Sequence, residues 1–281
     1  MAFSINFNSN GAETRNDAQK MAMISKLTQY LRTEIKLNIP EDIYTKWDKE
    51  DKQNFLLYIS AKNSIQEVAS RPFIFFGQDH KGAIQSQKHY DSLGYSTLLY
   101  NTGAYISTDL SNSLLAFPTE SLVFIVIHES MHTHLKGKNI PYVIEEASCD
   151  LMANYASLKF FEKYYIKEIS KVKKQTKLNE KLIRNINDGQ KLAEVALLQH
   201  KDAIYNVTDK KIKNLIKRGN SLHKERFNYS VNNAFFVRYQ NYTKNYFALK
   251  SKFLESKNFD DFLKFVENQA EKKPKIINTI E

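Results

Sequence analysis

The first third of the chain alternates between helical and extended patterns of apolar residues. From Asp17 to Leu37, apolar side chains recur at about every third or fourth position, which predicts an amphipathic helix ended by Asn38-Ile39-Pro40. Two more helices are predicted over residues 50–69 and 81–93, and Gly94 ends the second of them. Strands are expected between and after these two helices.

Short runs rich in β-branched and aromatic residues predict a small sheet. The three predicted strands lie at residues 71–76, 95–100 and 104–108, with a turn at Asn101-Thr102-Gly103 between the last two. The sheet therefore precedes the long apolar segment in the middle of the chain.

A pair of helices is expected in the middle of the chain. Six consecutive apolar residues, 122–127, precede His128 and predict a deeply buried helix with Thr119 as its N-cap. The apolar run alone would also suit a buried strand. Gly137 is expected just beyond the helix end, and a second helix from Tyr142 would run roughly antiparallel to the first.

The C-terminal part reads as helical from Tyr155 onward and is strongly basic. Residues 160–226 carry 17 Lys or Arg against 8 Asp or Glu, so most of the net charge of +10 lies there. Such an excess is typical of a solvated helix face, although it would also suit an acidic partner or an anionic membrane surface. No nucleic-acid-binding motif accompanies it, so no nucleic-acid partner is expected.

The whole pattern predicts an α+β fold that is mostly α. The expected parts are a flexible N-terminal segment, a core with a small β-sheet and a helical lobe packed on the core, at residues 1–16, 17–158 and 159–281. The single cysteine excludes an intrachain disulfide, and no stretch is apolar enough to predict a transmembrane helix. No signal peptide is visible, so the expected location is the cytoplasm, or the periplasm or a membrane anchor if a leader was removed.

The candidate chemistry is centred on His128-Glu129-Ser130-Met131-His132, a His-Glu-x-x-His motif. Positions i and i+4 of a helix point the same way, so the two imidazoles could bind one metal ion. Glu129 would then reach a metal-bound water, which is the arrangement that zinc hydrolases use. The alternative is a buried helix with two incidental histidines, but these polar groups would be costly to bury without partners.

Glu146, fourteen residues beyond His132, is the expected third metal ligand, because the second helix would bring it back beside the histidines. Asp150 lies one turn further and could hold a ligand histidine by its other N–H group. Neighbouring helix positions diverge by roughly 100°, so only one of Glu145 and Glu146 is expected to face the histidines. Close packing of the two helices is favoured by three small residues, Ala147, Cys149 and Ala153.

The sequence from His128 to His132, followed by Glu146-x-x-x-Asp150, resembles the gluzincin metallopeptidases. Its flanks resemble more specifically the family of predicted bacterial zinc aminopeptidases. The stretches that carry this resemblance span most of residues 20–270 and are His89–Tyr95 with Gly103–Thr108, Pro118–Leu122 and Val231–Ala234. The spacer between His132 and Glu146 is shorter than in thermolysin-like enzymes.

This resemblance implies a zincin-like catalytic core, a peptide substrate and zinc-dependent hydrolysis of peptide bonds, in particular aminopeptidase activity. Zn²⁺ held by His128, His132 and Glu146 would polarise the scissile carbonyl, and Glu129 would be the general base. The resemblance also implies that residues 104–108 form the strand that pairs with the substrate, with an ordinary hairpin as the alternative.

Several roles stay open. Tyr105, Tyr239 or Tyr242 could stabilise the oxyanion, and Glu145 is a candidate for binding the substrate amine only by its proximity. The motif residues also fit two other functions. One is a non-catalytic domain with structural zinc, whose fourth ligand would be Cys149 or His134, and the other is a basic helical binding protein with an incidental motif.

Overall fold

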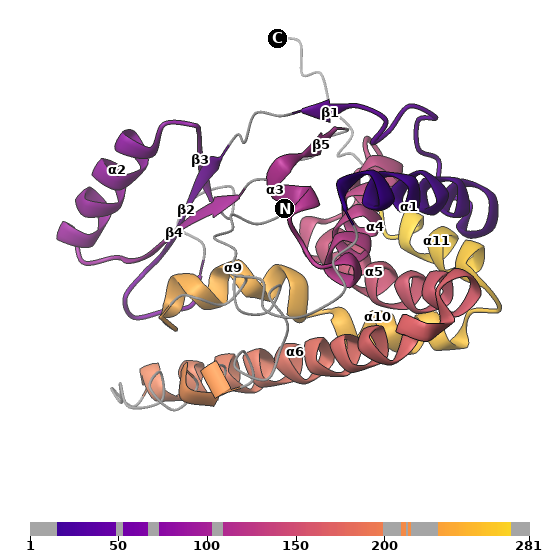
Figure 1. Cartoon of the computed structure of the whole chain (residues 1–281). Coiled ribbons are helices and arrows are strands. Elements are labelled where there is room, and N and C mark those ends of the chain that lie inside the picture. Colours follow the sequence, from indigo (N-terminus) through magenta and orange to yellow (C-terminus); the bar gives the residue numbers. More distant parts are fainter. Residues whose placement is uncertain are drawn as a thin grey trace, which may run out of the picture.

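The computed structural model describes residues 16–48, 53–66, 73–102, 109–198, 209–211, 213–214 and 230–270. Within these ranges the chain is mostly helical, with a small antiparallel sheet of three strands, which confirms the predicted α+β composition. The sheet and α2 lie on one side of the molecule, and most of the other helices gather on the opposite side (Figure 1). The described helices include none with the length and apolar character needed to cross a membrane.

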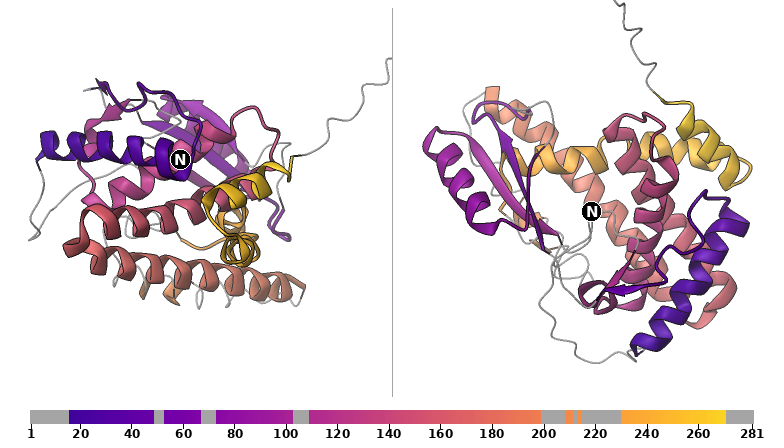
Figure 2. Two further views of the ribbon diagram at one scale, coloured as in Figure 1. Left: turned by 90° about the vertical axis from the view of Figure 1, so that its right-hand side faces the viewer. Right: turned by 90° about the horizontal axis from the view of Figure 1, so that it is seen from above.

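The three-stranded sheet has the order β3-β2-β4, with β2 (Asn54–Ser60) in the centre between β3 (Ile74–Gly77) and β4 (Ser96–Thr102). Helices pack on both of its faces: α2 (His80–Ser92) on one and α9 (Asn233–Thr243) on the other (Figure 2). The sheet is therefore a middle layer, and α9 connects it to the helical side of the molecule.

The prediction of a helix over residues 50–69 is wrong, because β2 occupies the middle of that range. All residues from Phe55 to Ser60 are buried, since the strand is central and both of its faces are covered. The strand therefore lacks the alternation of apolar and polar residues that marks a half-buried strand. A short apolar run without this alternation fits a helix as well as a strand.

The predicted turn at residues 101–103 is also wrong for its first two residues. Asn101 and Thr102 extend β4 and pair with Phe55 and Asn54, because β2 is long enough to offer partners there. The predicted strand at residues 104–108 lies outside the described residues. The predictions of a strand near residues 71–76 and of a helix ended by Gly94 are confirmed by β3 and α2.

The N-terminal helix α1 (Asp17–Tyr30) begins with a capping box in which Asn16 and Gln19 bond each other's backbone N–H groups. It continues into a π-helical turn, Leu31–Ile35. A loop then leads to β1 (Trp47–Asp48), which pairs in parallel with β5 (Leu110–Ser111). The short helix α3 (Asn112–Leu115) follows β5, and α1 packs against the central helix α4.

Two helices form the centre of the molecule: α4 (Thr119–Leu135), which is buried along almost its whole length, and α5 (Tyr142–Tyr164). The predicted N-cap Thr119 is instead the first helical residue of α4. The Pro118 carbonyl already accepts backbone bonds from residues 121 and 122, so helical bonding starts one residue earlier. Gly137 has a φ of 80° after the end of α4, as predicted.

Further helices of the described residues pack around this centre. They are α6 (Ile169–Leu198) after a 3₁₀ turn at Ile166–Glu168, then α10 (Tyr246–Glu255) and α11 (Phe259–Glu267). One hydrophobic cluster joins residues from α1 through α11. The boundary expected at residues 158–159 falls inside α5, so the expected core and lobe share that helix.

Candidate metal centre

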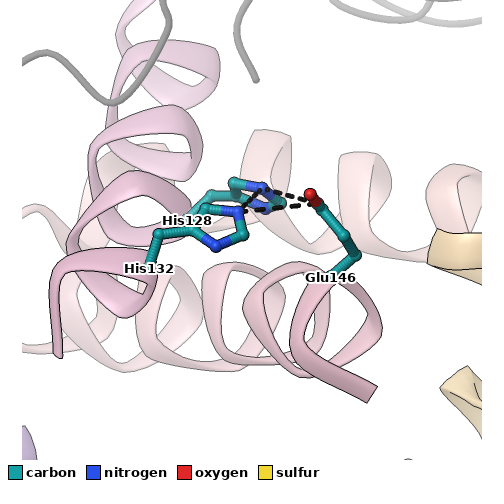
Figure 3. Close-up of side chains that lie close together, drawn as sticks. All are labelled: His128, His132 and Glu146. Carbon is teal, nitrogen blue, oxygen red and sulfur yellow. Dashed lines mark hydrogen bonds and ion pairs between the residues drawn. The ribbon is translucent and has the colours of Figure 1, made fainter. Parts of the chain in front are cut away.

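Three side chains from α4 and α5 converge at the centre of the molecule. His128 and His132 lie one turn apart on α4, and Glu146 reaches them from α5 (Figure 3). Their exposed fractions are 4%, 9% and 1%, so the three polar groups are almost entirely removed from solvent. They form a group of His, Cys, Asp or Glu side chains that could hold a metal ion.

The three inward-facing atoms form a nearly equilateral triangle. The Nε2 atoms of His128 and His132 are 3.2 Å apart. The Oε2 atom of Glu146 lies 3.4 Å from the first nitrogen and 3.5 Å from the second. One ion could therefore contact all three atoms without a large movement of either helix.

A carboxylate from α5 contacts the outer nitrogen of each histidine. His128 Nδ1 lies 3.0 Å from Asp150 Oδ1, at an angle that is poor for a hydrogen bond, and His132 Nδ1 lies 2.8 Å from Glu145 Oε1. A carboxylate accepts hydrogen bonds, so these contacts favour the tautomer with the proton on Nδ1. The two Nε2 lone pairs then point into the triangle.

In this tautomer, two imidazole lone pairs and one carboxylate oxygen face one another. Glu146 Oε2 is buried and accepts no hydrogen bond from the described residues. Burial raises the pKa of Glu146, but the neighbouring His132 and His128 hold it well below its usual range, so Glu146 is an anion. Three electron-rich atoms at this separation repel one another unless a cation lies between them. The donor set therefore fits a bound metal ion.

A proton can supply part of the same positive charge. Burial lowers the pKa of His132, but the polar and acidic groups around it, which include Glu146 and Glu145, hold it well above its usual value. A metal ion must displace that proton to reach Nε2, so proton and metal compete for the site.

Both of the adjacent glutamates contact the histidines, which corrects the prediction that only one would do so. Glu146 faces Nε2 of His132 from inside the triangle, and Glu145 bonds Nδ1 of the same ring from outside. The two glutamates point in directions roughly 100° apart on the helix. Both still reach His132, because an imidazole ring has a nitrogen on each of two sides. Sequence reasoning missed this contact of Glu145, although the acidic pair itself was a visible signal.

Glu129 follows His128 on α4 and is also buried, with 3% of its surface exposed. The charges of both His128 and His132 act on its carboxylate. A carboxylate in this position can accept a proton from a molecule at the triangle.

The two alternative ligands named from the sequence have other environments. His134 accepts a hydrogen bond from the Asn38 backbone at 2.8 Å through Nδ1, and its Nε2 lies 3.0 Å from Glu267 Oε1. Both of its nitrogens are thus engaged away from the triangle. Cys149 lies beside His132, but burial raises the pKa of its thiol to about 12, so the group is neutral at physiological pH.

Tyr242, one of the tyrosines considered for the oxyanion, contacts the metal-binding group. Its ring stacks against His128 with a centroid distance of 6.3 Å and an interplanar angle of 25°. Tyr239 packs instead against Phe235 at a centroid distance of 4.5 Å. Tyr105 lies outside the described residues.

The fold and the site define a mostly helical protein with a buried group of two histidines and one glutamate that could hold a metal ion. Comparison with protein-family models, with curated proteins and with solved structures gives no match. The functional argument therefore depends on the residues of this chain.

Proposed function

We propose that the protein is a zinc-dependent peptidase with a zincin-like core, and that it acts as an aminopeptidase. The observation that carries this proposal is the triangle formed by His128, His132 and Glu146, with Glu129 buried next to it. A His-Glu-x-x-His helix supplies two imidazoles and a base, and a carboxylate from a second helix completes a three-ligand set.

The triangle has the dimensions of a zinc site. Zinc bonds to imidazole nitrogen and carboxylate oxygen are about 2.0–2.2 Å long, so two ligand atoms of a tetrahedral site lie about 3.3–3.5 Å apart. The separations between the three atoms are 3.2, 3.4 and 3.5 Å. Three protein ligands leave the fourth corner of a tetrahedron for water or substrate, as catalytic zinc sites do.

The residues around the triangle have distinct roles in hydrolysis. Zinc, when bound, polarises the scissile carbonyl and lowers the pKa of water. Glu129 takes the proton from the attacking water and delivers it to the leaving amine. Glu145 keeps the proton of His132 on Nδ1 by a hydrogen bond, and the charge of Asp150 favours the same tautomer of His128, which leaves both Nε2 atoms available as ligand atoms.

The assignment as an aminopeptidase depends on the resemblance of the motif and its flanks to that family. Glu145 bonds His132, so the structure supports it as a residue that orients a ligand histidine. A digestion that removes single residues from the amino end of peptides would support the aminopeptidase assignment. Cleavage at internal peptide bonds would support the proposal of a peptidase but contradict the assignment as an aminopeptidase.

The test combines metal analysis with digestion of a peptide library, read by mass spectrometry, for the wild type and Glu129→Gln. Both proteins should bind one zinc ion, because all three ligands remain. Removing the general base should lower turnover by about 10²–10⁴-fold. Glu162→Gln, a change of the same kind at an exposed position of α5, serves as the control. Wild-type turnover in Glu129→Gln, or a wild-type protein without zinc, would contradict the proposal.

A further inference from the structure

Arg238 is a buried cation on α9, the helix that packs against both the sheet and α5. Its exposed fraction is 1%, and a guanidinium group stays protonated even in a protein interior. Nη1 donates a hydrogen bond at 3.0 Å to the hydroxyl of Tyr58 on β2. The guanidinium also lies over the ring of Tyr100 on β4, 3.4 Å from the ring centroid. These two contacts attach the side chain of Arg238 to the sheet.

Two tyrosines of α9 also contact this guanidinium. Its central carbon lies 5.0 Å from the ring centroid of Tyr239 and 5.9 Å from that of Tyr242. Arg238 and Tyr242 are one helical turn apart, so their side chains leave the same face of α9. A cation within about 6 Å of an aromatic ring is attracted to the ring, and the attraction is stronger where water is excluded. The charge of Arg238 therefore holds the Tyr242 ring on the side of α9 that carries both residues.

The Tyr242 ring contacts a member of the metal-binding group on α4. It stacks against the imidazole of His128, with the ring centroids 6.3 Å apart and an angle of 25° between the planes. Phe124, one turn before His128 on α4, stacks against the same imidazole. Phe124 and His128 belong to one helix, whereas Tyr242 comes from α9, so its place depends on contacts outside α4. A chain of contacts thus runs from the sheet through Arg238 and Tyr242 to His128.

We propose that Arg238 is a positioning residue that holds the Tyr242 ring against His128 and so fixes the plane of that imidazole. A ligand histidine binds a metal well only when its nitrogen lone pair is aimed at the ion, and the groups around the ring set that aim. The bond to Tyr58 and the contact with Tyr100 keep the guanidinium in place. The effect on zinc affinity rests on the proposed function, whereas the positioning of the imidazole requires no metal.

The positioning is tested by nuclear magnetic resonance on the full-length, metal-free protein with carbon-13 at Cε1 of histidine. The chain has seven histidines, and the signal of His128 is identified by its loss in His128→Gln. Arg238→Met should shift this signal in the same direction as Tyr242→Leu, because both changes reduce the ring current at the imidazole. Arg184→Met is the matched control, since this arginine of α6 lies over the ring of Phe247, 4.5 Å from its centroid, and should leave the signal in place. An unchanged His128 signal in Arg238→Met or Tyr242→Leu would overturn the proposal.

Tyr58→Phe covers the case in which circular dichroism shows that Arg238→Met does not fold. It removes only the hydroxyl that accepts the hydrogen bond from Nη1 of Arg238. The guanidinium is then held less firmly, so the His128 signal should shift in the same direction as in Tyr242→Leu, but by less. A His128 signal at its wild-type position in Tyr58→Phe would contradict the proposal.

Zinc affinity then shows whether Arg238 acts through Tyr242. Tyr242→Leu should weaken zinc binding by about 10–100-fold and Arg238→Met by about tenfold, and the double variant should bind as Tyr242→Leu does. Tyr242→Phe keeps the ring and should bind as the wild type does. Additive losses in the double variant, or a loss in Tyr242→Phe equal to that in Tyr242→Leu, would overturn the proposal. If the wild type binds no zinc, the proposed function fails, and the His128 signal still decides the positioning.

Discussion

The two adjacent glutamates of α5 should contribute very differently to zinc affinity, although both contact His132. Glu146 Oε2 faces both Nε2 atoms and would bind the metal directly. Glu145 bonds the outer nitrogen of His132 and would act on the metal only through that ring. Replacing either glutamate with glutamine preserves the size of the side chain and removes one charge. Any difference in zinc affinity between the two variants therefore comes from the position of the glutamate.

The expected magnitudes follow from this geometry. Structural zinc sites with four ligands bind with about 10–16 kcal/mol, so one ligand accounts for roughly 2.5–4 kcal/mol, or about two to three orders of magnitude in Kd. Replacing a residue that orients a ligand histidine typically weakens metal affinity by about 10–100-fold. Glu146→Gln should therefore weaken zinc binding by about 10²–10³-fold, and Glu145→Gln by about 10–100-fold at most.

The measurement is a competition titration against a chromophoric chelator of known zinc affinity, at a single pH near 7.5. A fixed pH matters because protons compete with zinc for His132. Glu162→Gln, exposed on α5 and paired with Lys159, should have the wild-type Kd. A larger loss in Glu145→Gln than in Glu146→Gln would refute the ligand assignment.

Three further changes test other parts of the structure. His132→Ala should abolish the rise in melting temperature on adding zinc, measured by differential scanning fluorimetry, and a rise equal to that of the wild type would exclude the motif as the site. Lys20→Met should lower the free energy of unfolding in urea by about 1–3 kcal/mol, because the carbonyls of Leu115 and Phe117 lose a buried donor, and an unchanged value would show that water replaces it. Neutralising exposed lysines of α6 should leave hydrolysis of a small neutral peptide within about twofold of the wild type, and a large loss would place this helix at the substrate. The residues to change are Lys173, Lys174, Lys177 and Lys181.

The central helix pair could be predicted because its signals are local. Six apolar residues before His128 indicate a buried segment, and Gly137 marks the end of α4 by adopting a φ of 80°. The i, i+4 spacing then fixes the two histidines on one face of the helix. None of these inferences depends on which distant segments pack against α4.

The central strand β2 could not be predicted because its signal is non-local. Residues 55–60 are buried on both faces by α2 and α9, and α9 lies more than 170 residues further along the chain. A strand covered in this way has no alternation to detect. The left-handed backbone of Tyr44, in the loop between α1 and β1, could not be predicted either, because tyrosine does not mark such a conformation as glycine does.

The pair Glu145 and Glu146 shows where a helical-wheel argument stops being sufficient. Backbone positions roughly 100° apart do point in different directions, and this favours a single ligand. An imidazole, however, presents polar nitrogens on two sides, and the two glutamates reach opposite sides of the His132 ring. The divergence between neighbouring positions therefore allows one residue to face the metal-binding group from inside and the next to bond the outer side of the same imidazole ring. The same reasoning applies to Glu146 and Asp150, which share a helix face and contact the two nitrogens of His128.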